Sequence, residues 1–382
     1  MKFNGYVREN GKVGIRNHVL VMSSVGCANT VVEKISAQTG ANPITHQQGC
    51  LQLGVDQELT KKTLIGAGNN PNIGAVLIVG LGCETVQPTL LAEHIKGKRV
   101  EYITIQECGG TTKAVEKGVA IVREMQKELE KQKREPVDIS HLIIGLKCGG
   151  SDTFSGLTAN PVLGYVSDRL VDLGGTVILS ETPGFFGGDR YLRERIVTEE
   201  GRKKFDEILN TMWQESSRLG ETLADGELSP GNIKGGLTTL IEKSLGGIKK
   251  GGSRPIQGVL DFADEITGKG LWIMDTPGFD IITISGQTAG GAQMILFTTG
   301  RGSPVGCTLS PVIKVCSNSK TYEWMNEDMD INAGKIIDEG LPISEVGEEL
   351  LMKMIEVANG EPTKSELAGH KEFALARVGS TL

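Results

Sequence analysis

The segment "HVLVMSSVGCANTVVEKISAQTGANPITH" (residues 18–46) decides the fold class. An apolar run at 18–22 leads into a turn of small residues, then a stretch of helical periodicity at 28–40, then a second short run at 42–46. This order predicts a strand, a helix and a strand. Strands that are apolar almost throughout are typical of a parallel sheet covered on both faces. The segment therefore predicts an α/β protein.

The same rhythm continues outward along the chain. Strands are expected at 75–80 and 100–105, and an amphipathic helix from residue 111 ends at Pro136, where we place a domain boundary. A second series follows, with a helix at 160–175, a closing helix at 343–360 and strands at 141–150, 176–180, 271–275, 294–300 and 312–317. We predict two Rossmann-like or flavodoxin-like parallel-sheet domains, 1–136 and 137–382. The second carries a helical insertion at about 188–224 and a glycine-rich loop at 228–253.

Composition narrows the class of partner. The chain has 382 residues, enough for two cores, and its net charge of −7 comes with scattered basic residues. It offers no basic face for nucleic acid. The longest apolar run, 75–79, is too short to span a membrane, and the N-terminus lacks the features of a secretory signal. We therefore expect a cytoplasmic protein with reduced thiols.

Three of the seven cysteines follow a common pattern. Cys27, Cys50 and Cys83 each follow a glycine, and the gaps of 23 and 33 residues are about one strand-helix unit each. They are therefore expected at the carboxyl ends of successive strands, the edge of an α/β sheet where ligands bind. Three thiolates there could hold an iron-sulfur cluster with one iron left free, or a single soft metal ion. The alternative is that they are packing residues. Cys148 shares the geometry in the second half.

Several polar residues are candidates for binding or proton transfer. His46 could ligate iron or take a proton, or could only shape its loop. The loop 228–253 lacks the P-loop spacing, but its Lys234 and Lys243 suit a carboxylate or an enolate, unless they form a solvated basic turn. Arg301, between two glycines after a strand, could hold a carboxylate through two hydrogen bonds.

The turn "KCGGSDTFSGLTANP" (147–161) is rich in small and polar groups. It offers Asp152 and Asn160 to a polyhydroxylated ligand, and its glycines let the backbone approach. A capped turn between a strand and a helix would have the same composition, because Ser, Asp and Asn also favour caps.

These stretches, with "GYVRENGKVGIRN", "GCLQLG", "VGLGCE", "SPGNIKGGLTTLIEKSLG", "TTGRGSP" and "MDINAGKII", resemble the altronate/galactarate dehydratase (UxaA) family over nearly the whole chain. The resemblance implies an enzyme that removes water from a sugar acid, D-altronate or D-galactarate, to give a 2-keto-3-deoxy acid. It also implies a need for ferrous iron, with Mn²⁺ as a possible substitute.

One departure from the family bears on partners. Many relatives begin with a SAF-type domain, whereas this chain starts directly at "GYVREN". It therefore resembles the large subunit of a split enzyme, with a small SAF-domain subunit as its expected partner in a homo- or hetero-oligomer. The large subunit of (2R)-sulfolactate sulfo-lyase is the alternative, and a non-catalytic binding subunit is the third. The sulfo-lyase branch is expected to lack the three thiols, so dehydration is preferred.

Dehydration next to a carboxylate requires stabilisation of an aci-carboxylate dianion while the β-hydroxyl departs. On this basis, Cys27, Cys50 and Cys83 are assigned to iron, in a pocket expected to face the glycine-rich loops of the C-terminal half. Arg301 and Lys243 are assigned to the substrate carboxylate. Three other side chains are assigned to the hydroxyl groups of the substrate: Asp152, Asn160 and Asn232. Lys243, Lys234 and His46 remain three alternatives for the base.

Overall fold

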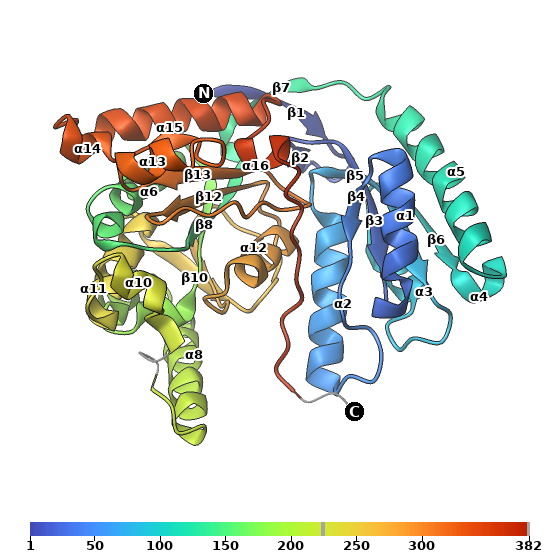
Figure 1. The fold of residues 1–382 in the computed structure, drawn as a ribbon, viewed down its shortest axis with the longest axis horizontal. Helices are drawn as coiled ribbons and strands as arrows, with labels where there is room; N and C mark the ends of the chain where they lie inside the picture. Colours follow the sequence, from blue (N-terminus) through green and yellow to red (C-terminus); the bar gives the residue numbers. More distant parts are fainter. Residues whose placement is uncertain (223–225, 380–382) are drawn as a thin grey trace.

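Three sheets organise residues 1–222 and 226–379, the part of the chain that the computed structural model describes (Figure 1). Two sheets are wholly parallel, which confirms the predicted α/β class with two parallel-sheet domains. The third is a small antiparallel sheet that the sequence patterns did not indicate. No helix in the described ranges is long and apolar enough to cross a membrane.

The N-terminal sheet has four strands, in the order β4-β3-β5-β6. Helices α1 and α5 cover one face of it, and α2 and α3 cover the other, because alternate strand residues enter separate apolar clusters on the two faces. The strands are β3 (His18–Ser23), β4 (Asn42–Ile44), β5 (Ile73–Gly80) and β6 (Arg99–Thr104). The helices are α1 (Asn29–Thr39), α2 (Gly54–Asn69), α3 (Pro88–His94), α4 (Ile105–Cys108) and α5 (Thr111–Leu129).

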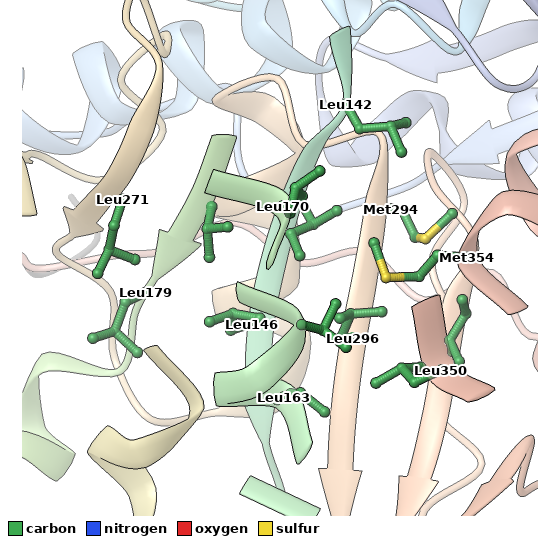
Figure 2. Close-up of a cluster of buried hydrophobic side chains, with 14 of the residues drawn as sticks. Leu142, Leu146, Leu163, Leu170, Leu179, Leu271, Met294, Leu296, Leu350 and Met354 are labelled. Atoms are coloured by element: carbon green, nitrogen blue, oxygen red, sulfur yellow. The ribbon is translucent and has the colours of Figure 1, made fainter. Parts of the chain in front are cut away.

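The C-terminal sheet has seven strands, in the order β10-β11-β9-β8-β12-β13-β14. They are β8 (Ile143–Cys148), β9 (Thr176–Leu179), β10 (Ile256–Leu260), β11 (Gly270–Met274), β12 (Met294–Thr299), β13 (Val312–Cys316) and β14 (Ile331–Asn332). Figure 2 shows one face, where Leu146 and Leu296 meet Leu163 of α6 (Ala159–Asp172) and Leu350 of α15 (Ile343–Ala358). Helix α12 (Asp280–Ala289) covers the other face.

The predicted insertion range contains α7 (Asp189–Arg195) and α8 (Glu199–Arg218). The Thr198 side chain caps α8 by accepting a hydrogen bond from the backbone N–H of Gly201. Residues 223 and 224 of that range, and 380–382 of the second predicted domain, lie outside the described residues. The predicted glycine-rich loop 228–253 is partly helical: it contains α10 (Pro230–Lys234) and α11 (Leu240–Gly247), which the side chains of Ser229 and Thr239 cap. Other helices of the described residues are α13 (Ser319–Trp324), α14 (Lys335–Asp338) and α16 (Lys364–Leu367).

The small antiparallel sheet joins the chain start to the connection between the parallel sheets. Strand β1 (Lys2–Val7) pairs with β2 (Val13–Gly14) and with β7 (Glu135–Asp138). The predicted boundary at Pro136 falls inside β7. The charged segment before Pro136 gave no strand pattern, because β7 is an exposed edge strand whose pairing partner lies at the other end of the domain.

The two parallel sheets meet through their amino ends. Asn72, just before β5, donates hydrogen bonds from Nδ2 to the carbonyls of Gln293 (2.8 Å) and Leu309 (3.1 Å). Gln293 directly precedes β12. A single apolar cluster crosses the junction and includes Leu20 and Ile295, one from each sheet. Helix α2 also packs along α12, and Lys62 of α2 pairs with Asp264, so the contact between the domains extends along these two helices as well.

The segment after α16 returns to the N-terminal domain (Figure 1). The backbone N–H groups of Val378 and Gly379 donate to the two carboxylate oxygens of Asp56, on α2, at 2.7 and 2.8 Å. The backbone of Ala374 also binds Ser285 of α12. This segment thus ties together the helices on the two sides of the domain junction.

Candidate active site

Each parallel sheet has a switch point, where successive connections leave a strand in opposite directions. In the N-terminal sheet, β3 lies between β4 and β5, and in the C-terminal sheet, β8 lies between β9 and β12. Ligands of open parallel sheets bind outside the carboxyl ends of the strands at such points. Cys27 follows β3 and Cys148 ends β8, so both switch points carry a thiol.

The three cysteine loops of the N-terminal domain form one surface. The backbone N–H of Gly26 donates to the carbonyl of Gln48 (3.0 Å), and that of Thr85 donates to Gly49 (3.1 Å). These bonds connect the loops that carry Cys27, Cys50 and Cys83. The thiols of Cys27 and Cys83 are exposed, and that of Cys50 is half-buried. The fold therefore gathers the loops that carry the three predicted ligands.

The thiols of this surface do not form a metal site in their present arrangement. Among the residues that the structure describes, no group of three His, Cys, Asp or Glu side chains could hold a metal ion. The three thiols therefore do not fit an iron centre as they are arranged here, although their loops are in contact and two of them reach solvent. A metal at this edge would need the side chains or loops to move.

The expectation that these thiols face the C-terminal loops is wrong for a single chain. The two sheets approach each other at their amino ends, so their carboxyl edges point in different directions. In Figure 1, α4 marks the end of β6 in the N-terminal sheet, and α11 lies beside the C-terminal loops. These two helices are on opposite sides of the molecule. The sequence could not reveal this, because strand periodicity does not say how two domains are docked.

His46 is buried, with 5% of its surface exposed. Its Nε2 lies 2.8 Å from the carbonyl of Ser23, and its Nδ1 accepts from the backbone N–H of Gln48 at 3.1 Å. Burial lowers the pKa of His46 to about 4, although the hydrogen bond to Ser23 acts in the opposite direction and raises the pKa. With both ring nitrogens occupied, the geometry favours the alternative in which His46 shapes the loop.

The depressed pKa of His46 makes a prediction for acid stability. The unfolded chain binds a proton at this histidine below about pH 6.5, while the folded chain does so only near pH 4, so stability falls as the pH drops between these values. We expect His46 to account for about 2 kcal/mol of lost stability between pH 7.5 and pH 5. Urea unfolding of the wild type and of His46→Gln at both pH values measures this. An equal pH dependence in the two proteins would contradict it.

Two cavities open at the carboxyl edge of the C-terminal sheet, and both are lined by Asp152. The first, the Arg301 cavity, has a volume of about 440 Å³ and is also lined by Gly300, Ser317 and Lys320. The second, the Lys243 cavity, has a volume of about 240 Å³. Its lining includes Ser151, Asn160 and Lys249 as well as Lys243. The predicted substrate residues of the C-terminal half therefore gather around one switch point.

Asp152 is held mainly by the protein itself. Its carboxylate accepts from the backbone N–H of Ser155 (2.8 Å), from Ser317 Oγ (2.7 Å) and from Asn318 Nδ2 (3.0 Å). A Cβ atom at Gly300 would overlap the Asp152 side chain, so only glycine fits there. Asp152 therefore caps the turn that follows it, which was the alternative to binding a ligand. Its fixed side chain forms a rigid wall between the cavities.

Asn160 and Asn232 are also buried and bound within the protein. Asn160 Nδ2 donates to the carbonyl of Gly246 (3.0 Å), and its Oδ1 accepts from Thr298 Oγ1 (2.7 Å). Asn232 Nδ2 donates to the carbonyl of Ser151 (3.0 Å). Both amides fix the loops that line the Lys243 cavity, and only Asn160 also lines it.

The three predicted cations differ in their surroundings. Lys243 is half-buried and its Nζ pairs with Glu227 Oε2 at 3.1 Å. Arg301 is exposed, and no side-chain hydrogen bond or ion pair joins its guanidinium to any residue in the described ranges. Its backbone N–H is fixed by the carbonyl of Gly150 (2.9 Å). Lys234, exposed in the last turn of α10, is not among the residues that line the two cavities.

The sequence analysis missed a buried charged cluster beside these cavities. Lys147 pairs with Glu181 and with Asp280 (Oδ1 at 2.9 Å), and Lys250 pairs with Glu181 (Oε2 at 2.5 Å). A signal was present, because Lys147 interrupts the apolar strand "IIGLKC", and a buried charge is costly unless it is paired. Which residues would supply them was not visible in the sequence.

Comparisons with known proteins fit this arrangement. Residues 5–130 match the family described as D-galactarate dehydratase/Altronate hydrolase, second domain, and residues 139–381 match D-galactarate/Altronate dehydratase, C-terminal. The chain belongs to the D-galactarate/altronate dehydratase family. This membership confirms the family that the sequence motifs resemble. Dehydratases are hydro-lyases, so the chain is an enzyme of that class.

Individual relatives of this dehydratase family cover nearly the whole chain. Altronate dehydratase of Bacillus subtilis is 39% identical over 100% of this chain and 78% of its own length. The (2R)-sulfolactate sulfo-lyase subunit beta of Chromohalobacter salexigens is 35% identical, over 98% of this chain and 97% of its own length. Galactarate dehydratase (L-threo-forming) of Escherichia coli is 34% identical, over 94% of this chain and 73% of its own length.

Proposed function

We propose that this chain is the large subunit of a sugar-acid dehydratase that converts an altronate- or galactarate-type acid into a 2-keto-3-deoxy acid. The observation that supports this most is the gathering of cations around one switch point. Arg301 and Lys243 line two cavities that share Asp152 as a wall. Such a site suits a small, polyhydroxylated anion better than a nucleotide, and the chain has no P-loop or dinucleotide-binding glycine pattern.

The reaction needs stabilisation of negative charge. Removing the proton next to a carboxylate places a second negative charge on the acid, so fixed cations lower the barrier. Arg301 has no ion-pair partner in the described chain and is held through its backbone, so its guanidinium is free to bind a carboxylate through two hydrogen bonds. Lys243, paired with Glu227, supplies a second cation where charge develops.

Alternatively, Lys243 acts from its neutral amine as the base, and it is the one of the three base candidates that the geometry favours. It is the only one of the three candidates that is among the residues lining the two described cavities. His46 uses both ring nitrogens in its own loop, and Lys234 lies outside the cavity walls. We therefore place Lys243 in contact with the substrate.

Iron remains part of the proposal. Bound ferrous iron, whether in an iron-sulfur cluster or as a single ion, with Mn²⁺ as a substitute, would act as a Lewis acid. Cys27, Cys50 and Cys83 would hold it after rearrangement, because the present arrangement offers no three-ligand set among the described residues. The roles proposed for Arg301 and Lys243 do not depend on the metal.

A partner chain is also proposed. Three exposed apolar side chains, Leu51, Leu53 and Val55, follow Cys50 directly, with exposed fractions of 59%, 44% and 70%. The name of the Chromohalobacter relative marks it as one subunit of a larger enzyme. We propose that a small SAF-domain subunit joins this chain in the cytoplasm and covers this surface, within a homo- or hetero-oligomer.

The function is tested by assaying the protein anaerobically with its partner subunit on D-altronate, D-galactarate and (2R)-sulfolactate. Formation of a 2-keto-3-deoxy acid from either sugar acid supports the proposal. Release of sulfite from sulfolactate alone would establish the alternative, because the same proton abstraction can expel a sulfonate. Binding of the acids with no turnover would favour the third reading, a non-catalytic subunit.

Replacement of each of the three proposed iron ligands by serine tests the metal assignment. We expect each of Cys27→Ser, Cys50→Ser and Cys83→Ser to lose bound iron and turnover together, because serine is a poor ligand for soft metals. Iron per chain and acid-labile sulfide are measured after anaerobic purification. Cys108→Ser, at a half-buried thiol of α4, is the control and should keep its iron. Full iron content in the three variants would refute the assignment.

A further inference from the structure

The carboxyl end of β8 carries a buried charged cluster that the proposed reaction does not use. It consists of the buried Lys147, Glu181 and Lys250 and the partly exposed Asp280, two cations and two anions. Lys147 also donates to the carbonyl of Gly278 at 2.8 Å. Burial alone would lower the pKa of Lys147, but Glu181 and Asp280 raise it above its ordinary value, so the lysine stays charged.

Stability alone does not explain this cluster. A buried ion-pair network is on average no more stabilising than apolar residues of the same volume, because removing the charges from water is costly. Glu181 also has a φ of 72°, in the left-handed region that costs a non-glycine residue about 1–3 kcal/mol. Strain of this kind persists mostly where it serves a site.

The cluster clamps the backbone on both sides of Cys148. Glu181 Oε2 accepts from the backbone N–H of Cys148 at 3.0 Å, and Lys147 Nζ donates to the carbonyl of Cys148 at 3.2 Å. Both peptide groups that flank this residue are therefore fixed by the same ion pair. Lys250 donates to the same oxygen, Oε2, and Lys147 holds Oε1, so both lysines orient the carboxylate.

The clamped residue begins the loop that both cavities share. From Cys148 the chain turns through residues 149–151 to Asp152, which lines the Arg301 cavity and the Lys243 cavity. Along this loop, Gly150 also binds the backbone N–H of Arg301, and Ser151 Oγ lies 2.7 Å from Cys148 Sγ. A shift at Cys148 would therefore move groups on both sides of the proposed substrate.

We infer that Lys147, Glu181 and Lys250 are positioning residues of the active site. They are buried and do not touch the substrate; they hold the loop 148–152 in the orientation that catalysis needs. This inference rests on the proposed dehydration. Because a displacement of about 1 Å in a positioned group can cost about 100-fold in rate, loosening the loop should lower kcat more than it raises KM.

The test replaces the charges by apolar residues of similar volume. We expect the triple variant Lys147→Met, Glu181→Leu, Lys250→Met to lose no more than about 10 °C in Tm, because replacing the ion pairs is nearly neutral but part-buried backbone groups of Cys148 and Gly278 lose their partners. Its kcat should fall at least about 100-fold. The half-exposed Asp280 can be solvated once its lysine is gone. The matched control is the double variant Arg254→Gln, Asp172→Asn, which removes an exposed ion pair. It should alter neither Tm nor kcat.

A second readout does not depend on the substrate. The rate at which iodoacetamide alkylates Cys148, followed by peptide mass spectrometry, should change at least 5-fold in the triple variant, while the rates at Cys27 and Cys83 stay constant. If the wild type turns over no sugar acid, the proposed function fails but this measurement still tests the loop. Unchanged kcat and unchanged Cys148 alkylation would overturn the inference, as would losses of activity that merely follow a lower Tm.

The single variant Glu181→Gln provides the same test if the triple variant does not fold. It keeps the shape of the side chain and leaves Lys147 paired with Asp280. We expect its kcat to fall at least about 10-fold, with KM changed less than 3-fold, and the alkylation rate of Cys148 to change in the same protein. Wild-type values for kcat and alkylation would overturn the inference.

Discussion

Lys243→Met is expected to lower kcat/KM for the sugar acid at least about 1,000-fold while the protein remains folded. Lys243 is half-buried at a cavity of about 240 Å³, and its ammonium lies 3.1 Å from Glu227. Methionine keeps the aliphatic packing but removes the charge and the exchangeable proton. A cation or a base acting in the transition state contributes several kcal/mol, which corresponds to this loss. Steady-state kinetics, with circular dichroism as a folding check, measures it.

Two further variants sharpen this result. Lys243→Arg keeps the positive charge but cannot act as a base, so activity within about 10-fold of wild type assigns charge stabilisation, and loss equal to that of Met assigns proton transfer. Lys234→Met, at the exposed lysine nine residues earlier, is the matched control and should stay within about 3-fold. If Lys243→Met retained more than a tenth of wild-type activity, Lys243 would not contact the substrate.

Asn72→Leu is expected to produce the largest loss of stability, at least about 4 kcal/mol. The Asn72 side chain is fully buried at the junction of the two domains. It accepts from the backbone N–H of Ile15 (2.9 Å) and donates to two carbonyls that precede β12 and β13. Leucine would leave these backbone groups buried without partners, at about 1–3 kcal/mol each.

Urea unfolding measures the effect, and Asn69→Leu is the matched control. Asn69 lies three residues earlier at the end of α2, and its amide binds the carbonyl of His94 (3.2 Å) near the surface. Water can replace that bond, so the control should lose less than about 1 kcal/mol. Equal losses in the two variants would show that the domain junction does not depend on Asn72.

The sequence predicted those parts of the fold that have a local pattern. The apolar runs at 18–22 and 75–80 became β3 and β5, because a strand buried on both faces needs continuous apolar residues. The amphipathic stripe from Val115 to Leu129 became the buried face of α5. Strands β2, β7, β10 and β14 were missed because they are edge strands, two of them only two residues long. The central strand β1 was missed because its pairing partners are the short β2 and the distant β7.

The candidate site was predictable in part. Glycine-containing turns at strand ends indicated Asp152, Asn160 and Arg301, and the glycine-rich segment 228–253 indicated Lys243. The structure gathers these residues around one switch point. The sequence could not show that Asp152 and the two asparagines spend their hydrogen bonds on neighbouring loops, since Ser317, Thr298 and Gly246 come from distant segments. The same limit hid the partners of Lys147.

By itself, the sequence determined the α/β class, the two parallel sheets and the family, because these follow from residue periodicity and from local motifs. Only the tertiary structure decided how the sheets dock: their amino ends meet at Asn72, which separates the cysteine loops from the cavities of the C-terminal domain. It also decided which polar groups are free for a ligand. Burial and hydrogen-bond partners depend on contacts between residues far apart in the chain, and no local pattern encodes them.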